Sequence, residues 1–180
     1  MLSLLSLFAA IFLVVFSLIA HEMGHWVVLR RLNVQVLQWW LGLGPAIMHL
    51  GRYRIGMLPI GASVYPDPEQ YAALSTRQRM AVALGGPIGS AAYGLALLVA
   101  ANQVHFAIGK HGLEQLAVAN FMIALFNMVP VPPLDGFALL EALLERIGRP
   151  LSPRGKAFSY RIGNGLVYGL GFFVLARFIP

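Results

Sequence analysis

The chain has 180 residues, of which 58% are hydrophobic and 11% are charged, and its mean hydropathy is +0.73. Soluble domains carry about 25% charged residues, so this composition excludes an ordinary soluble domain and indicates a membrane protein. The absence of cysteine excludes disulfides and thiolate metal sites, which leaves His, Asp and Glu as metal ligands. The net charge of +6 comes from cations that flank apolar runs without interleaved aromatic residues, and this arrangement predicts no nucleic-acid partner.

Four apolar runs are long enough to form transmembrane helices. The first has neither the basic n-region nor the small-residue cleavage site of a secretory signal, so we expect it to be retained. No repeat or separate soluble domain is evident, so residues 1–180 are expected to form a single membrane-embedded domain. The expected spans cover about residues 2–29, 80–101, 114–130 and 158–178.

Basic residues predict how these spans are oriented. Six arginines lie between the first and second spans, and five basic residues lie between the third span and the apolar run that begins at Ile162. The connection between the second and third spans has only Lys110. Because cytoplasmic segments are enriched in Lys and Arg, both termini are expected outside. The sequence predicts a multi-pass protein of a bacterial or archaeal cell membrane, in contact with lipid.

Residues 34–65 have the pattern of β-strands and not of a further span. VQVLQWW and MHLGRYRIG alternate apolar with polar residues, and glycines and prolines interrupt them as turn residues do. The stretch from 65 to 79 is expected to be a loop or an interfacial helix. The predicted fold is therefore an α-helical integral membrane protein of about four transmembrane helices, with a small membrane-associated β element between the first two.

The strongest chemical signal is the sequence HEMGH at residues 21–25. On a helix His21 and His25 share a face, so both imidazoles can bind one cation, and Glu22 can reach a water beside it. Titratable groups within a span are costly and are usually functional. The alternative is a polar helix-packing patch in which the histidines are only hydrogen-bonded.

A second signal is the sequence NMVPVPPLDG at residues 127–136. Its prolines must end any helix, and irregular backbone at membrane depth is tolerated only where protein or water satisfies it. Alone, such a stretch is commonly a plain turn. The first and third spans run in the same direction, however, so Asp135 is expected near HEMGH at the cytoplasmic ends of two parallel helices. A catalytic zinc site usually has three protein ligands, and Asp135 is a candidate for the third.

The two motifs together resemble the site-2 protease family of intramembrane metalloproteases. That family's HExxH stands here as HEMGH, and its N-x-x-P-x-P-x-L-D-G stands as NMVPVPPLDG. Between them, GLGPAI and RYRIGMLPIGASVY resemble the family's GxGP segment and its membrane-associated β element. The resemblance covers most of residues 15–145, and it is to a minimal form without a PDZ or nucleotide-sensing domain.

The resemblance implies an enzyme that cuts proteins in or near a transmembrane segment. It implies one Zn²⁺ per chain, held by His21, His25 and Asp135. It also implies that Glu22 is the general base and that Asn127 contacts the substrate. The expected partners are a membrane protein with a transmembrane helix as substrate and a regulatory membrane protein that gates access.

Two departures and two rival functions accompany this interpretation. Ser90 stands where the family usually has Asn in G-P-x-x-N, and Ala62 stands where P-x-G-G has its second Gly.

A catalytically silent relative that binds membrane proteins could keep the same fold. A metal or ion transporter could use the same residues as a transit site. For the proteolytic function, the unwound substrate is expected to pair with an edge of the β element, with MHLGRYRIG as the candidate strand.

Overall fold

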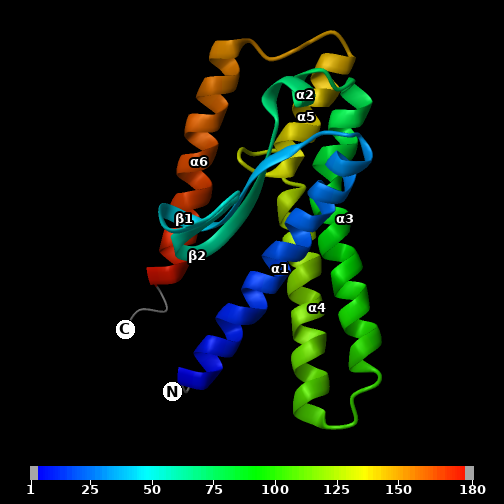
Figure 1. Ribbon diagram of the computed structural model, residues 1–180, viewed down its shortest axis with the longest axis vertical. Helices are drawn as coiled ribbons and strands as arrows, with labels where there is room; N and C mark the ends of the chain where they lie inside the picture. Colours follow the sequence, from blue (N-terminus) through cyan, green and yellow to red (C-terminus); the bar gives the residue numbers. More distant parts are fainter. Residues whose placement is uncertain (1–3, 177–180) are drawn as a thin grey trace.

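The computed structural model describes residues 4–176 as a set of helices with one small sheet (Figure 1). The fold is mostly α-helical, with the β element between the first two long helices, as predicted. In chain order the elements are α1 (Leu4–Arg31), β1 (Val36–Leu50), β2 (Tyr53–Pro66), α2 (Pro68–Ala72), α3 (Thr76–Ala101), α4 (Ala107–Asn127), α5 (Asp135–Arg146) and α6 (Pro153–Ala176).

The four expected spans correspond to α1, α3, α4 and α6. Residues 2–3 and 177–178 of those spans lie outside the described residues. The largest difference in bounds is in α4, which begins at Ala107, so that the connection before it is shorter than expected. Within the described part of the chain, α3 alone is both long and apolar enough to meet a length-and-composition test for a membrane span.

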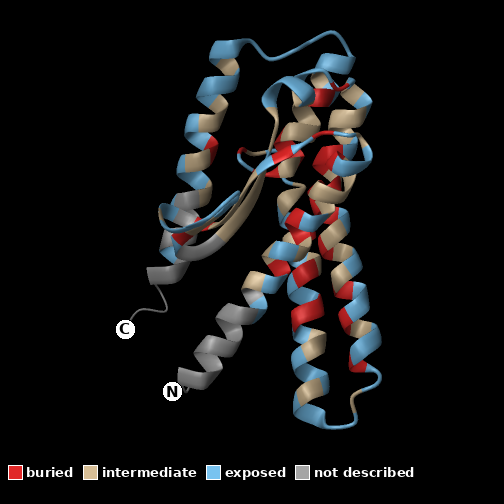
Figure 2. Cartoon of the chain, viewed as in Figure 1, coloured by how far each residue is buried: buried red, intermediate tan, exposed pale blue. Residues whose placement is uncertain are grey.

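The long helices α1, α3 and α4 form the body of the molecule. Helix α3 packs against α1 on one side and against α4 and α5 on the other (Figure 1). Buried residues gather where these helices meet, whereas most described residues of α6 are exposed (Figure 2). Leu97, Leu116 and Ala117 form the buried core of the hairpin between α3 and α4. The body is therefore a helical bundle beside which α6 stands largely apart.

The contact between α1 and α3 is very close because both helices have glycine where they cross. A Cβ atom added at Gly24 would overlap the carbonyl group of Gly85 and lie 3.1 Å from the Cα of Gly89. Small residues let helix backbones approach in this way and are typical of helix contacts in membranes. The crossing lies within HEMGH, so the backbone of the metal-binding motif lies directly against α3.

The β element is folded so that residues 39–41 and residues 53–55 each pair with two other segments. Residues 39–41 are aligned with residues 62–64 and also with residues 53–55. Residues 48–50 pair with 53–55 as well. The segment 53–55, which belongs to the expected substrate strand MHLGRYRIG, thus has partners already. Residues 62–64 have β1 on one side only, and their other edge lies toward α1.

An apolar cluster anchors the β element to the ends of α1 and α3. The partly buried side chains packed on this cluster include Trp26, Trp39 and Val64, which come from α1, β1 and β2. The sheet is consequently held beside HEMGH by side-chain packing. The buried members of the cluster are Leu29, Val34, Val36, Leu74 and Val82.

A short helix, α2, follows the sheet, in the stretch expected to be a loop or an interfacial helix. The carboxylate of Asp67 caps it by accepting hydrogen bonds from the backbone N–H groups of Glu69 and Gln70. The next helix, α3, starts with a capping box between Ser75 and Gln78. These caps fix where the chain turns from the sheet into the bundle.

Helix α5 was not predicted, although its sequence has helical periodicity. Phe137 and Ala142 are buried, and the charged residues of α5 form ion pairs with neighbouring helices. The carboxylate of Glu141 lies 3.0 Å from the Lys156 ammonium on α6, and that of Glu145 lies 2.5 Å from the Arg79 guanidinium on α3. These pairs position α5, whose first residue is Asp135.

Candidate metal centre

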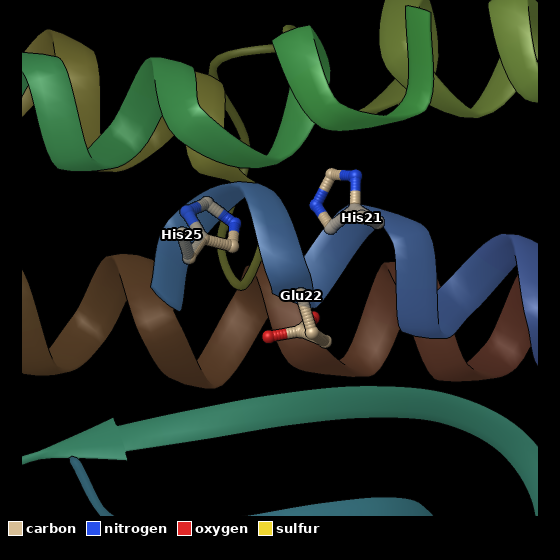
Figure 3. Close-up of side chains that lie close together, drawn as sticks. All are labelled: His21, Glu22 and His25. Atoms are coloured by element: carbon tan, nitrogen blue, oxygen red, sulfur yellow. The ribbon is translucent and has the colours of Figure 1, made fainter. Parts of the chain in front are cut away.

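HEMGH lies on the second half of α1, and its three titratable side chains are buried. His21, Glu22 and His25 are exposed by 6%, 7% and 8%. One nitrogen or oxygen atom from each residue lies within 4.8 Å of the others. Figure 3 shows the two imidazole rings pointing toward α3 and the Glu22 carboxylate pointing toward β2. Helix α1 therefore presents the two imidazoles on one face and the Glu22 carboxylate on the adjacent face.

Asp135 reaches the two histidines from the far end of the chain. Helix α4 ends at Asn127, the proline-containing loop turns back, and α5 begins with Asp135. The carboxylate oxygen Oδ2 of Asp135 lies 3.0 Å from His21 Nε2, and Oδ1 lies 3.2 Å from His25 Nε2. The structure thus brings together the two motifs, as the parallel directions of α1 and α4 predicted.

Both histidine rings have a second partner, and both partners lie on α3. The Nδ1 atom of His21 lies 3.0 Å from the hydroxyl oxygen of Ser90, and Nδ1 of His25 donates to the Val82 carbonyl at 2.7 Å. Ser90 departs from the family pattern, but it still makes a polar contact inside the site. Sequence reasoning singled out Ser90 only as a departure. It could not find Val82, because that contact uses the main chain.

Gly86 forms the wall of α3 that faces the histidines. A Cβ atom added there would overlap the Nε2 atoms of both His21 and His25. Pro87 follows it and has no N–H group, so the carbonyl of Ala83 lacks its usual helical partner. The rings can approach α3 this closely only because residue 86 has no side chain.

Glu22 contacts the β element. Its Oε2 atom accepts a hydrogen bond from the backbone N–H of Val64 at 2.9 Å. This N–H lies on the edge of residues 62–64 that faces α1 and not β1. The carboxylate of HEMGH and this strand edge are therefore direct neighbours.

Asn127 lies at the end of α4, outside the contacts that join the other four residues. Its side-chain amide N–H donates to the carbonyl of Ile123, one turn earlier in the same helix, at 2.9 Å. The structure therefore places the predicted substrate-contacting residue on the same segment as Asp135 but not in the His–Glu–Asp cluster.

The side chains of His21, His25 and Asp135 fit a zinc ion. Two imidazole nitrogens and one carboxylate oxygen form a common donor set of catalytic zinc sites, which keep a fourth position open for water. Each ring is oriented through its Nδ1 atom, so its Nε2 atom faces Asp135. Such outer hydrogen bonds are typical of zinc-binding histidines.

Known proteins share this fold and parts of this sequence. A solved structure described as site-2 protease from Methanocaldococcus jannaschii matches 93% of this chain and 68% of that chain, with a TM-score of 0.60 and 23% identity. This likeness shows a common fold. A zinc metalloprotease from the same organism is 27% identical over 142 residues, covering 77% of this chain and 35% of that protein. Protease RseP of Photorhabdus luminescens is 38% identical over 81 residues, covering 44% of this chain and 33% of that protein.

This chain therefore matches about a third of the length of the zinc metalloprotease from Methanocaldococcus jannaschii and of protease RseP. The family comparison is more extensive. The sequence profile of peptidase family M50 matches residues 9–113 and 99–170, which contain HEMGH and the loop that carries Asp135. Site-2 proteases form a family of membrane proteins, in agreement with the hydropathy of the sequence. With most of its length matched, the chain belongs to peptidase family M50.

Proposed function

We propose that this chain is an intramembrane zinc metalloprotease that hydrolyses a peptide bond in or near the transmembrane segment of a membrane-protein substrate. The observation that carries the proposal is the position of Asp135, whose two carboxylate oxygens lie 3.0 and 3.2 Å from the Nε2 atoms of His21 and His25. Glu22 is buried beside them. This constellation combines a three-residue metal site with a neighbouring base, which is what metal-assisted hydrolysis needs.

His21, His25 and Asp135 would hold one zinc ion per chain. When bound, zinc supplies Lewis acidity, which lowers the pKa of a water toward about 7 and polarises a carbonyl group. The protein contributes the backbone of Gly86, which lies directly against both imidazoles, and fixed ring orientations. These features keep the ligands preorganised, so little rearrangement is needed during the reaction.

Glu22 is the proposed general base. The hydrogen bond from Val64 N–H holds its Oε2 atom, so Oε1 is the oxygen that takes the proton from the attacking water. The same carboxyl group then delivers this proton to the nitrogen of the leaving amine as the peptide C–N bond breaks. Proton transfer by a positioned side chain of this kind typically contributes about 10²–10⁴-fold to the rate.

The substrate is proposed to bind as an extended strand. A helical peptide bond is shielded by its own hydrogen bonds, so the substrate must unwind before hydrolysis. The edge of residues 62–64 lies beside Glu22, which already holds the Val64 N–H. Strand addition there would use the other main-chain groups of this edge and would place the unwound segment next to the site. Asn127 uses its amide N–H within α4, so its amide oxygen is the atom available to accept from the substrate backbone.

The proposed setting is a single membrane domain of residues 1–180, with α1, α3, α4 and α6 as its spans and both termini outside. The start of α1, the end of α6 and the connection from α3 to α4 lie toward one end of the molecule (Figure 1). Helix α2 and the connection from α5 to α6 lie toward the other end, which carries most of the basic residues. The site would then face the cytoplasmic side, and a membrane partner could regulate substrate entry.

A reconstituted cleavage assay tests the proposal. The full chain in liposomes would be mixed with a model protein whose single transmembrane segment contains a helix-breaking residue, before and after zinc removal by a chelator. We expect cleavage that is lost on chelation and restored by zinc. Zinc binding without cleavage of any model span would instead support a silent relative, and zinc uptake into sealed vesicles would support a transporter.

A further inference from the structure

We propose that Ser90 is a positioning residue that holds the His21 imidazole in the orientation and tautomer needed to bind metal. This inference rests on the proposed zinc site. Ser90 is fully buried, with 0% exposure, and its hydroxyl oxygen lies 3.0 Å from His21 Nδ1. The two residues are 69 positions apart, on α1 and α3. Their contact is therefore a tertiary one, made possible by the close crossing of these helices.

A metal-binding histidine has two requirements that this contact meets. A neutral imidazole that offers the lone pair of Nε2 to a metal must carry its proton on Nδ1. An acceptor at Nδ1 stabilises that tautomer and also stops the ring from turning about its bond to Cβ. The Ser90 hydroxyl oxygen lies at this position and would be the acceptor in the metal-binding tautomer, while Nε2 of the same ring faces Asp135.

The two histidines differ in how their Nδ1 atoms are held, and only the orientation of His21 depends on a side chain of α3. His25 Nδ1 donates to the Val82 carbonyl, which is main chain and is present whatever side chain residue 82 carries. His21 instead depends on a side chain. Ser90 lies one turn after Gly86, whose backbone lies against both rings. Helix α3 thus orients both candidate ligands, and Ser90 is its one side-chain contribution to these contacts.

The Ser90 hydroxyl is uncharged, and this affects the electrostatics of the buried cluster. Many zinc-binding histidines donate to a carboxylate, which makes the imidazole a more basic ligand. A further carboxylate at residue 90 would add a third negative charge to a buried cluster that already contains Glu22 and Asp135, and desolvating such a charge is costly. A hydroxyl orients His21 without this charge.

The central test compares zinc affinity in two buried-serine variants. Ser90→Ala should weaken zinc binding by about 10–100-fold, the usual effect of removing an outer partner of a metal ligand. Ser17→Ala is the matched control, because Ser17 is 1% exposed and its hydrogen bonds among the described residues go to Asn120 and Leu13 and not to a histidine ring. Its zinc affinity should stay close to that of the wild type. Affinity would be measured by competition with a chromogenic chelator, which requires no substrate.

A second pair of variants separates the hydroxyl from packing. Thr and Val have almost the same shape, so Ser90→Thr should keep tight zinc binding and Ser90→Val should lose it. This pair also decides the question if Ser90→Ala does not fold. Nitrogen-15 NMR of the zinc-loaded protein supplies an independent readout: the Nδ1–H signal of His21 should shift or broaden in the alanine and valine variants, while that of His25 should not.

The outcomes also distinguish this inference from the proposed function. If the wild-type chain binds no zinc, the proposed metal site fails, and the role of Ser90 fails with it. If the wild type and Ser90→Ala bind zinc equally tightly, the zinc site stands and the positioning role of Ser90 is wrong. Where the alanine variant does not fold, equal affinity of Ser90→Val leads to the same conclusion.

Discussion

The Oε2 oxygen of Glu22 accepts a hydrogen bond from the main-chain N–H of Val64 at 2.9 Å. This contact joins the second residue of HEMGH to the edge of β2 that faces α1. It orients the proposed base through the backbone, so no particular side chain is required at residue 64 for the contact. It also places the base beside the strand edge at which an extended substrate could bind.

The first prediction concerns the proton transfer assigned to Glu22. Glu22→Gln should lower the cleavage rate by at least about 10²-fold, because an amide cannot take up the proton of the attacking water. Its side-chain oxygen can still accept from Val64, so the position of the side chain should persist. Cleavage rate and zinc content would be measured on the same preparations, and zinc content should not change.

The control for this variant is Glu114→Gln, an equally small change at a more exposed carboxylate, 3.9 Å from Lys110 on α4. It should leave the rate near that of the wild type. A Glu22→Gln protein that cuts the substrate normally would remove Glu22 from the role of general base.

The second prediction concerns the third zinc ligand. The wild-type chain should contain one zinc ion, and Asp135→Ala should contain much less, because two imidazoles alone form an incomplete site. Elemental analysis of the purified proteins measures this ratio. Glu114→Ala is a suitable control, since it removes a carboxylate that pairs with Lys110 within α4 and takes no part in positioning α5. Equal zinc in the wild type and Asp135→Ala would exclude Asp135 as a ligand.

The third prediction tests the wall formed by Gly86. Gly86→Ala should reduce zinc affinity, because the new methyl group would occupy space now taken by the Nε2 atoms of His21 and His25. Overpacking of this kind costs about 1–3 kcal/mol, which corresponds to roughly a 5–150-fold loss of affinity. Chelator competition would measure the loss.

Gly112→Ala provides the comparison for Gly86→Ala. Gly112 is also helical, but a Cβ atom added there meets nothing within 4 Å. Alanine has the higher helix propensity, so this variant should be at least as stable as the wild type and should bind zinc equally well. Unchanged zinc affinity in Gly86→Ala would show that the rings can move away from α3 without loss of the site.

The fourth prediction concerns orientation in the membrane. Single cysteines at Ala73 and Gly112, both exposed, should react from opposite sides of the membrane, since Ala73 directly follows α2 and Gly112 lies in the first turns of α4, after the α3–α4 connection. A membrane-impermeant maleimide applied to intact cells should label position 112 only. The chain has no native cysteine, so the unmodified protein is the blank. Labelling of position 73 alone would reverse the proposed topology.

The fifth prediction concerns the substrate. A model span cut near a Gly, Pro or Asn should be cut more slowly after these residues are replaced by Leu, because Leu makes unwinding of the helix less favourable. The same replacements placed far from the scissile bond should have little effect. Initial cleavage rates in liposomes measure both. Equal rates for all the substrates would mean that unwinding does not limit access to the strand edge of residues 62–64.

Local patterns in the sequence predicted much of this architecture. Apolar run lengths predicted the long helices, alternation predicted the β element, and the i, i+4 spacing of His21 and His25 predicted their shared face. The unpredicted features depend on contacts distant in sequence. The pairing of residues 39–41 with two other segments and the contact between Ser90 and His21 arise only when the chain folds. Helix α5 has a local pattern, but it is too short to be recognised as a span and was assigned no element.

The 114 positions between His21 and Asp135 impose an order on biosynthesis. A ribosome adds about 5–20 residues per second, so the aspartate is made about 6–23 s after the histidine. During that interval a nascent chain has HEMGH but lacks the carboxylate proposed to complete its ligand set. Hydrolytic competence would therefore arise only after the α3–α4 hairpin and the start of α5 have been synthesised.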